Sequence, residues 1–133
     1  MVKNYQKETE AETLKGTITC GSKVGYSGKE KFSLGQITNI VEKTHNEIAS
    51  KDMKSISCII SNGKLVMNTS KGIYKEEVYL LDFLWSPLSI PIDKKTFYQT
   101  LVEYLDLIGT AMRQERMYLD FENKTYVFKR INP

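Results

Sequence analysis

Two of the three arginines in this 133-residue chain stand close together, at Arg113 and Arg116, among sixteen lysines. Arginine carries a planar, permanently charged guanidinium that can hold a phosphate or carboxylate with two parallel hydrogen bonds, which lysine cannot do. A spacing of three residues at the end of an expected helix predicts that both side chains lie over one turn. They would then clamp a phosphate or pyrophosphate, or simply act as helix-terminal cations that pair with nearby carboxylates.

A glycine-containing segment, residues 21–29, is a second place where a phosphate could bind. Its glycine spacing does not match a P-loop, and Lys29 is followed by Glu30 instead of the serine or threonine that a P-loop requires. The dinucleotide-binding pattern is absent from it as well. Two roles remain: a flexible connection between a strand and a helix, or a cover in which backbone N–H groups and Lys23 contact a phosphate.

Aromatic residues at Phe83 and Trp85 are expected to share one face of a strand, because strand side chains alternate. Trp85, the only tryptophan, belongs either to the core or a subunit interface, or to a plate on which a nucleobase stacks. Such stacking contributes about 1–3 kcal/mol per base. A base stack together with an arginine clamp would form a nucleotide-binding site.

The sequence lacks the residues that most catalytic mechanisms require. The single histidine, His45, falls inside an expected helix and is interpreted as an ordinary surface residue, and no Gly-x-Ser-x-Gly motif is present. One histidine with two separated cysteines, Cys20 and Cys58, makes no metal-ligand set, and both thiols are expected to be reduced and buried. We therefore expect no catalytic residues, no metal and no cofactor. Several carboxylates could supply an acid–base pair, although their spacing resembles that of surface charges: Asp82, Asp93, Glu103, Asp106 and Asp120.

The composition of the chain limits the classes of partner that it can bind. The net charge of +3 is too small for the dense basic stripe that binds duplex nucleic acid, and it suits a small anionic ligand. No apolar run approaches the roughly 20 residues of a membrane span. The beginning of the chain lacks the apolar core of a secretion signal, so we expect a cytoplasmic protein.

Periodicity predicts the elements in order. Residues 13–21 alternate as a strand, and Ser33 with Gln36 forms a capping box before a helix that runs to about Ser50. Residues 55–61 and 64–68 are predicted to pair through an Asn62-Gly63 turn, the strongest short hairpin signal. Residues 73–85 form a longer strand, placed centrally. Asp93 then caps a second helix, and strands follow at residues 117–121 and 125–130.

These elements predict an α+β domain over residues 13–133, preceded by a flexible polar arm at residues 1–12. The expected architecture is a mostly antiparallel sheet with two amphipathic helices on one face. Its connections would follow the split-βαβ, ferredoxin-like arrangement, with a C-terminal hairpin added. Edge strands of such a sheet favour self-association, so a homodimer or larger oligomer is expected.

The chain also resembles a known family. The segment at residues 16–23 (Gly-Thr-Ile-Thr-Cys-Gly-Ser-Lys), the strand end Phe83-Leu84-Trp85 and the two arginines are similar to those of the Thoeris anti-defence signal-sponge family. The resemblance implies a non-enzymatic phage or prophage protein, working in the host cytoplasm, whose oligomers sequester cyclic ADP-ribose-type immune signals. Some members of that family also hold cyclic oligonucleotides, in pockets near subunit interfaces.

The leading hypothesis is therefore a protein that sequesters a phosphorylated, nucleotide-like signal without turning it over. Its expected ligand-binding residues are Cys20, Gly21, Lys23, Phe83, Trp85, Arg113 and Arg116. Two alternatives remain open. One is a small carboxylate-dependent enzyme acting on a nucleotide, and the other is a module that serves only oligomerisation.

Overall fold

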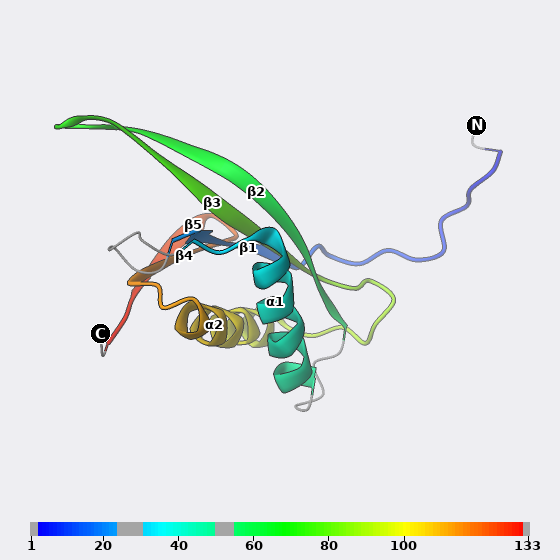
Figure 1. Ribbon diagram of the computed structural model, residues 1–133. Helices are drawn as coiled ribbons and strands as arrows, with labels where there is room; N and C mark the ends of the chain where they lie inside the picture. Colours follow the sequence, from blue (N-terminus) through cyan, green and yellow to red (C-terminus); the bar gives the residue numbers. More distant parts are fainter. Residues whose placement is uncertain (1–2, 24–30, 50–54, 132–133) are drawn as a thin grey trace.

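A computed structural model describes residues 3–23, 31–49 and 55–131 of the chain. Its elements are β1 (Lys15–Gly21), α1 (Leu34–Ala49), β2 (Ile56–Thr69), β3 (Gly72–Trp85), α2 (Lys94–Ala111), β4 (Arg116–Phe121) and β5 (Lys124–Lys129). The five strands form one sheet in the order β2-β3-β1-β4-β5, and every neighbouring pair is antiparallel. Both helices cover the same face of this sheet (Figure 1). The predicted fold class is confirmed.

The connections interlock two βαβ units. Strands β1 and β2 run parallel, are joined by α1, and are separated by β3. Strands β3 and β4 are likewise parallel, are joined by α2, and are separated by β1. This is split-βαβ connectivity, with β5 added beside β4 as the predicted C-terminal hairpin.

The core fills the space between the helices and the sheet. Gly16 shows how tightly the layers meet, because a Cβ atom added there would lie 2.5 Å from Leu101 Cδ1 on α2. The fully buried side chains come from both helices, the C-cap of α2 and three strands: Ile18, Cys20, Ile37, Ile48, Leu81, Phe83, Phe97, Leu101, Tyr104, Ile108, Met112 and Leu119. Helix α2 therefore rests directly on the middle strand.

Local signals fix both helix starts. The backbone N–H of Ser33 donates to Gln36 Oε1 at 2.8 Å, and the N–H of Gln36 donates to Ser33 Oγ at 3.2 Å. Asp93 Oδ1 accepts from the N–H of Thr96 at 2.7 Å. Both predicted caps are confirmed; each satisfies backbone donors that a helix start leaves without partners.

The predicted turn at Asn62-Gly63 is wrong. Strand β2 continues through both residues, which pair with Tyr79 and Val78 of β3. The reversal comes later, between Thr69 and Gly72, where Gly72 supplies the positive φ of 109°. A long β3 provides ladder partners for all fourteen residues of β2, and this pairing outweighs the local preference of Asn-Gly for a turn.

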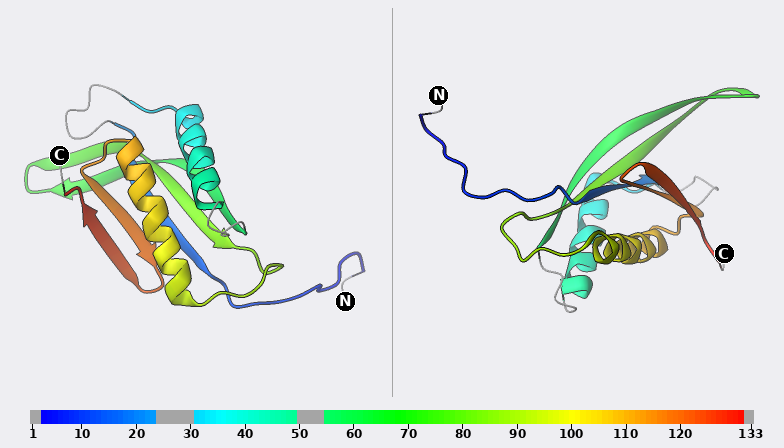
Figure 2. Two further views of the ribbon diagram at one scale, coloured as in Figure 1. Left: turned by 90° about the horizontal axis from the view of Figure 1, so that it is seen from below. Right: turned by 180° about the vertical axis from the view of Figure 1, so that it is seen from behind.

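The β2–β3 hairpin extends beyond the rest of the sheet. Pairing of β1 with β3 ends at Gly21 and Val78, so residues 64–76, here called the distal hairpin, have ladder partners only within β2 and β3 among the described residues. They arch away from the body on the side opposite the helices (Figures 1 and 2). Strand β3 lies between β2 and β1 and is therefore an interior strand of the sheet, as predicted.

Two further features bear on the predictions. Residues 3–13 are exposed and contain no helix or strand, and they lead away from the domain (Figure 1). Within the described parts of the chain, no helix is long and apolar enough to cross a membrane. The segment at residues 24–30, part of the glycine-containing segment, lies outside the described residues.

Candidate functional site

Polar groups from β3 and from the α2–β4 turn meet at the end of β1. A Cβ atom added at Gly21 would lie 2.9 Å from Glu76 Oε2 and 3.3 Å from Gln114 Oε1. The Glu76 carboxylate and the Gln114 amide therefore lie directly over this glycine. Because Gly21 has no side chain, the backbone of β1 is open to close approach at this point.

Gln114 holds this corner together. Its side chain is buried, its Oε1 accepts from the N–H of Gly21 at 3.2 Å, and its Nε2 donates to the carbonyl of Lys23 at 2.7 Å. Its own backbone N–H donates to the carbonyl of Gly109 at 3.0 Å. One amide thus ties the end of β1 to the turn between α2 and β4.

Ser22 contributes a buried hydroxyl. Its backbone N–H donates to the carbonyl of Glu77 at 3.1 Å, and its carbonyl accepts from the N–H of Phe32 at 2.6 Å. Its side chain is fully buried, and its Oγ has no hydrogen-bond partner within the described segments. Buried hydroxyls normally have a hydrogen-bond partner, so Ser22 Oγ is an exception among the described residues.

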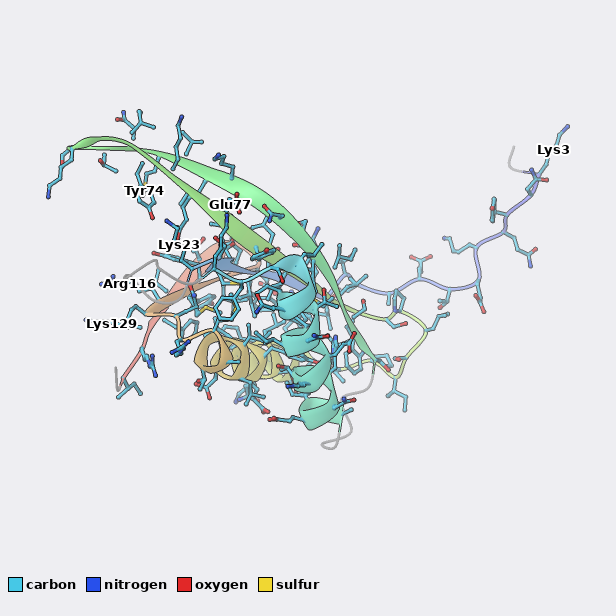
Figure 3. All side chains as sticks on the ribbon, in the orientation of Figure 1. Lys3, Lys23, Tyr74, Glu77, Arg116 and Lys129 are labelled. Atoms are coloured by element: carbon cyan, nitrogen blue, oxygen red, sulfur yellow. The ribbon has the colours of Figure 1, made fainter. Side chains whose placement is uncertain are left out.

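Tyr74 and Glu76 lie on one face of the distal hairpin, because they are two residues apart in a strand. The pKa of Tyr74 is raised by desolvation, by the charge of Glu76 and by a hydrogen bond to that carboxylate. Figure 3 shows Tyr74 pointing from the hairpin toward the side where Lys23 and Arg116 lie. Tyr74 and Glu76 therefore form a phenol–carboxylate pair on this face of the hairpin.

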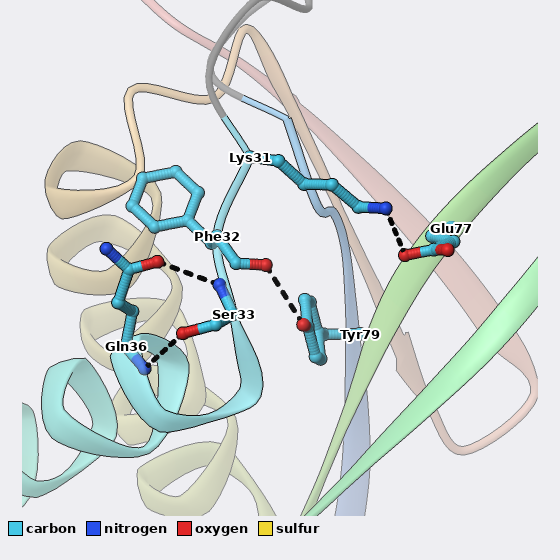
Figure 4. Close-up of polar contacts among 6 residues, drawn as sticks. All are labelled: Lys31, Phe32, Ser33, Gln36, Glu77 and Tyr79. Atoms are coloured by element: carbon cyan, nitrogen blue, oxygen red, sulfur yellow. Dashed lines mark hydrogen bonds and ion pairs between the residues drawn. The ribbon is translucent and has the colours of Figure 1, made fainter.

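An ion pair and a hydrogen bond fasten the start of α1 to the foot of the hairpin (Figure 4). Lys31 Nζ lies 2.7 Å from Glu77 Oε2, and the hydrogen bond to Lys31 lowers the pKa of Glu77. Tyr79 donates its hydroxyl to the carbonyl of Phe32 at 3.0 Å. The backbone bond from Phe32 to Ser22 and the hydrogen bond from Tyr79 hold the start of α1 against β1 and β3, whereas the exposed ion pair contributes little.

The structure separates the predicted binding residues into two groups. Gly21 and Lys23 belong to the corner just described, whereas Cys20 points to the helix side and its burial raises its pKa to about 12. Phe83 is fully buried against Tyr104, with ring centroids 4.7 Å apart. Trp85 is also buried, and its Nε1 donates to the carbonyl of Ile90 at 3.2 Å. The predicted aromatic plate is therefore part of the core.

The arginines do not share a helical turn, so this part of the prediction is wrong. Helix α2 ends at Ala111, Arg113 adopts a positive φ of 52° in the following turn, and Arg116 begins β4. The same turn places Gln114 where its side-chain amide bonds Gly21 and Lys23. Arg116 remains near the site, on the exposed face of the strand pair, opposite Lys129.

Sequence reasoning missed four residues of the site. Tyr74 and Glu76 carried one usable signal, since an alternating tyrosine and glutamate in a strand must share a face. The roles of Ser22 and Gln114 depend on tertiary contacts and leave no pattern in the sequence. His45 also differs from its interpretation: it is half-buried, and its Nδ1 lies 2.6 Å from the Tyr104 hydroxyl.

A groove borders the site on the helix side. It encloses a cavity of about 590 Å³ between α2 and the β4–β5 hairpin. Leu105, Met117 and Phe128 supply apolar walls, and Gln114 lines it as well. The groove and the corner at Gly21 are therefore neighbours that share one side chain.

No protein-family model and no curated protein matches the chain. Two solved structures share its fold. A phage SAM lyase in complex with S-methyl-5'-thioadenosine matches with a TM-score of 0.64 and 13% identity, over 98% of this chain and 99% of the other. A phage SAM lyase in the apo state matches with a TM-score of 0.62 and 12% identity, over 89% and 90%. At this identity the shared property is the fold, over nearly the whole length of both chains.

These matches correct two expectations. The expectation that the chain is not an enzyme is contradicted, because the solved structures of the same fold and size are those of a lyase. Both matched structures are of a phage protein, and neither supports the Thoeris sponge family. Among the alternatives stated from the sequence, the carboxylate-dependent enzyme that acts on a nucleotide is now the better supported.

Proposed function

We propose that this protein is an enzyme that binds S-adenosylmethionine and cleaves it, releasing S-methyl-5'-thioadenosine. The observation that carries the proposal is the pairing of Tyr74 with Glu76, whose carboxylate lies over Gly21. This pair occurs in a fold shared with a lyase that was solved with that product.

The chemistry suits a site of this kind. S-adenosylmethionine carries two positive groups, a sulfonium and an ammonium. When the bond between sulfur and the methionyl Cγ breaks, its electron pair stays on sulfur, and the leaving group departs as a neutral thioether. It needs no proton from the protein, so a histidine or a metal is not required. The Cγ then forms a bond to the substrate's own carboxylate oxygen, or a double bond to Cβ after Cβ loses a proton.

Glu76 is positioned to hold the positive methionyl end, and the Tyr74 hydroxyl fixes the orientation of the carboxylate. Lys23 and Arg116 supply cations for the substrate carboxylate on the same side of the molecule (Figure 3). Holding the two ends of the methionyl chain restricts its conformation, and such orientation is a large source of rate acceleration.

The test is to incubate the purified protein with S-adenosylmethionine and to measure S-methyl-5'-thioadenosine by mass spectrometry. Glu76→Gln is expected to lower the rate about 100-fold and Tyr74→Phe about 10-fold, since small misplacements of substrate have costs of this order. Glu77→Gln is the matched control. Its carboxylate is the next residue but pairs with Lys31, so its rate should stay within about threefold of wild type.

Absence of product with the wild-type chain, or equal rates for Glu76→Gln and Glu77→Gln, would show the proposal to be wrong. The same preparation also tests sequestration of a cyclic ADP-ribose-type signal. Such a ligand recovered unchanged after heating, with no conversion of S-adenosylmethionine, would favour the function that the sequence resemblance implies.

A further inference from the structure

The face of the distal hairpin that carries Tyr74 and Glu76, here called the site face, is apolar around its carboxylate. Leu65 is the Cα partner of Glu76, and Met67 is the Cα partner of Tyr74, so the four side chains lie on one face of the ribbon. Leu65 and Met67 are 39% and 44% exposed. Side chains directly opposite each other in antiparallel strands have Cβ atoms about 4.5–5.5 Å apart. Each apolar side chain therefore borders one member of the phenol–carboxylate pair.

The charges of the ribbon are divided between its two faces. Lys64 and Lys75 lie on the face opposite the site face, because side chains alternate along each strand. Over residues 64–69 and 72–76, the described strands of the distal hairpin, Glu76 is the only charged residue on the site face. The site face therefore presents one negative charge beside apolar surface, and no lysine of these strands lies next to it.

Such a surface suits a cation whose charge lies on sulfur. A sulfonium has three carbon substituents and no N–H or O–H group, so a nearby negative charge and the packing of its substituents hold it, and donated hydrogen bonds do not. The thioether of Met67 and the ring of Tyr74 are polarisable groups that pack well against such substituents.

We propose that Leu65 and Met67 are specificity-determining residues, which contact the neutral thioadenosine part of S-adenosylmethionine beside the carboxylate of Glu76. The inference rests on the proposed function and divides recognition of the substrate between two kinds of contact. Leu65 and Met67 hold the thioadenosine part, and Glu76 holds the positive charge. S-methyl-5'-thioadenosine has lost the sulfonium and the ammonium, so it keeps only the contacts with Leu65 and Met67.

Three single replacements by threonine test the assignment: Leu65→Thr, Met67→Thr and Val66→Thr. Threonine is a good strand former, and circular dichroism checks that each variant is folded. Val66 is the matched control, because it lies between the other two residues, on the opposite face of the ribbon, and is 58% exposed. Isothermal titration calorimetry measures the Kd for S-methyl-5'-thioadenosine, and mass spectrometry measures kcat and KM for S-adenosylmethionine.

Leu65→Thr and Met67→Thr should each raise the Kd and the KM about 10-fold and leave kcat within about threefold of wild type, because they remove contacts made equally in the ground and transition states. Val66→Thr should leave all three constants unchanged. Glu76→Gln should show the converse pattern. Its kcat falls about 100-fold, whereas its Kd for the uncharged product stays within about threefold of wild type.

A wild-type chain that does not bind S-methyl-5'-thioadenosine would overturn the proposal, as would equal affinities of Leu65→Thr, Met67→Thr and Val66→Thr for it. If Leu65→Thr and Met67→Thr alone weaken product binding but no S-adenosylmethionine is converted, the lyase proposal fails while the specificity assignment stands. If S-adenosylmethionine is converted with an unchanged KM in both variants, the lyase proposal stands and the specificity assignment is wrong.

Discussion

Gln114 is expected to be a principal determinant of both stability and site geometry. Replacing it with alanine removes its bonds to the N–H of Gly21 at 3.2 Å and to the carbonyl of Lys23 at 2.7 Å. Each net hydrogen bond contributes about 1 kcal/mol, and the buried groups left without partners raise the total to about 2–3 kcal/mol. With a urea dependence of about 1.5 kcal/mol per molar, the unfolding midpoint should fall by about 1.5 M.

Gln114→Glu sharpens this prediction. The variant retains an oxygen for Gly21 but directs a carboxylate at the carbonyl of Lys23, so its loss of stability should be at least as large as that of Gln114→Ala. Gln99→Ala is the control, since Gln99 is exposed on α2 and its loss should change stability by less than about 0.5 kcal/mol. Midpoints for Gln114→Ala and Gln99→Ala that agree with each other would refute the reasoning.

Two further predictions concern the core. Gly16→Ala should destabilise the fold by about 1–3 kcal/mol, because its Cβ would collide with Leu101. Gly35→Ala, in an open helical position, should be neutral or stabilising. Urea unfolding that ranks the two variants in the opposite order would contradict this packing. Burial lowers the pKa of His45, so the unfolded chain binds its proton first, and the unfolding free energy should decline as pH falls below 6.5. His45→Gln should lose that decline in urea midpoints measured across this range, and an unchanged pH profile would be evidence against the assignment.

The fold class could be predicted because its signals are local. The capping box at Ser33, the cap at Asp93 and the apolar stripe of α2 each depend on residues a few positions apart. Asn62-Gly63 misled the prediction for the same reason. A short-range turn preference competes there with the pairing of two fourteen-residue strands, and this partner is not visible locally.

The site was harder to predict because it depends on contacts between distant segments. Gln114 accepts from the N–H of Gly21 across 93 positions of sequence, a contact that no local pattern announces. Phe83 has the residue type of a stacking platform, but only the packing of Tyr104 shows that it is covered. The pairing of Tyr74 with Glu76 could have been predicted from the sequence, because alternation in a strand places both side chains on one face.

The most direct test of the account is the conversion of S-adenosylmethionine to S-methyl-5'-thioadenosine by wild type, Glu76→Gln and Glu77→Gln under identical conditions. The account predicts product from wild type and Glu77→Gln and about 100-fold less from Glu76→Gln. Product formation that is absent in all three, or equal in all three, would contradict it.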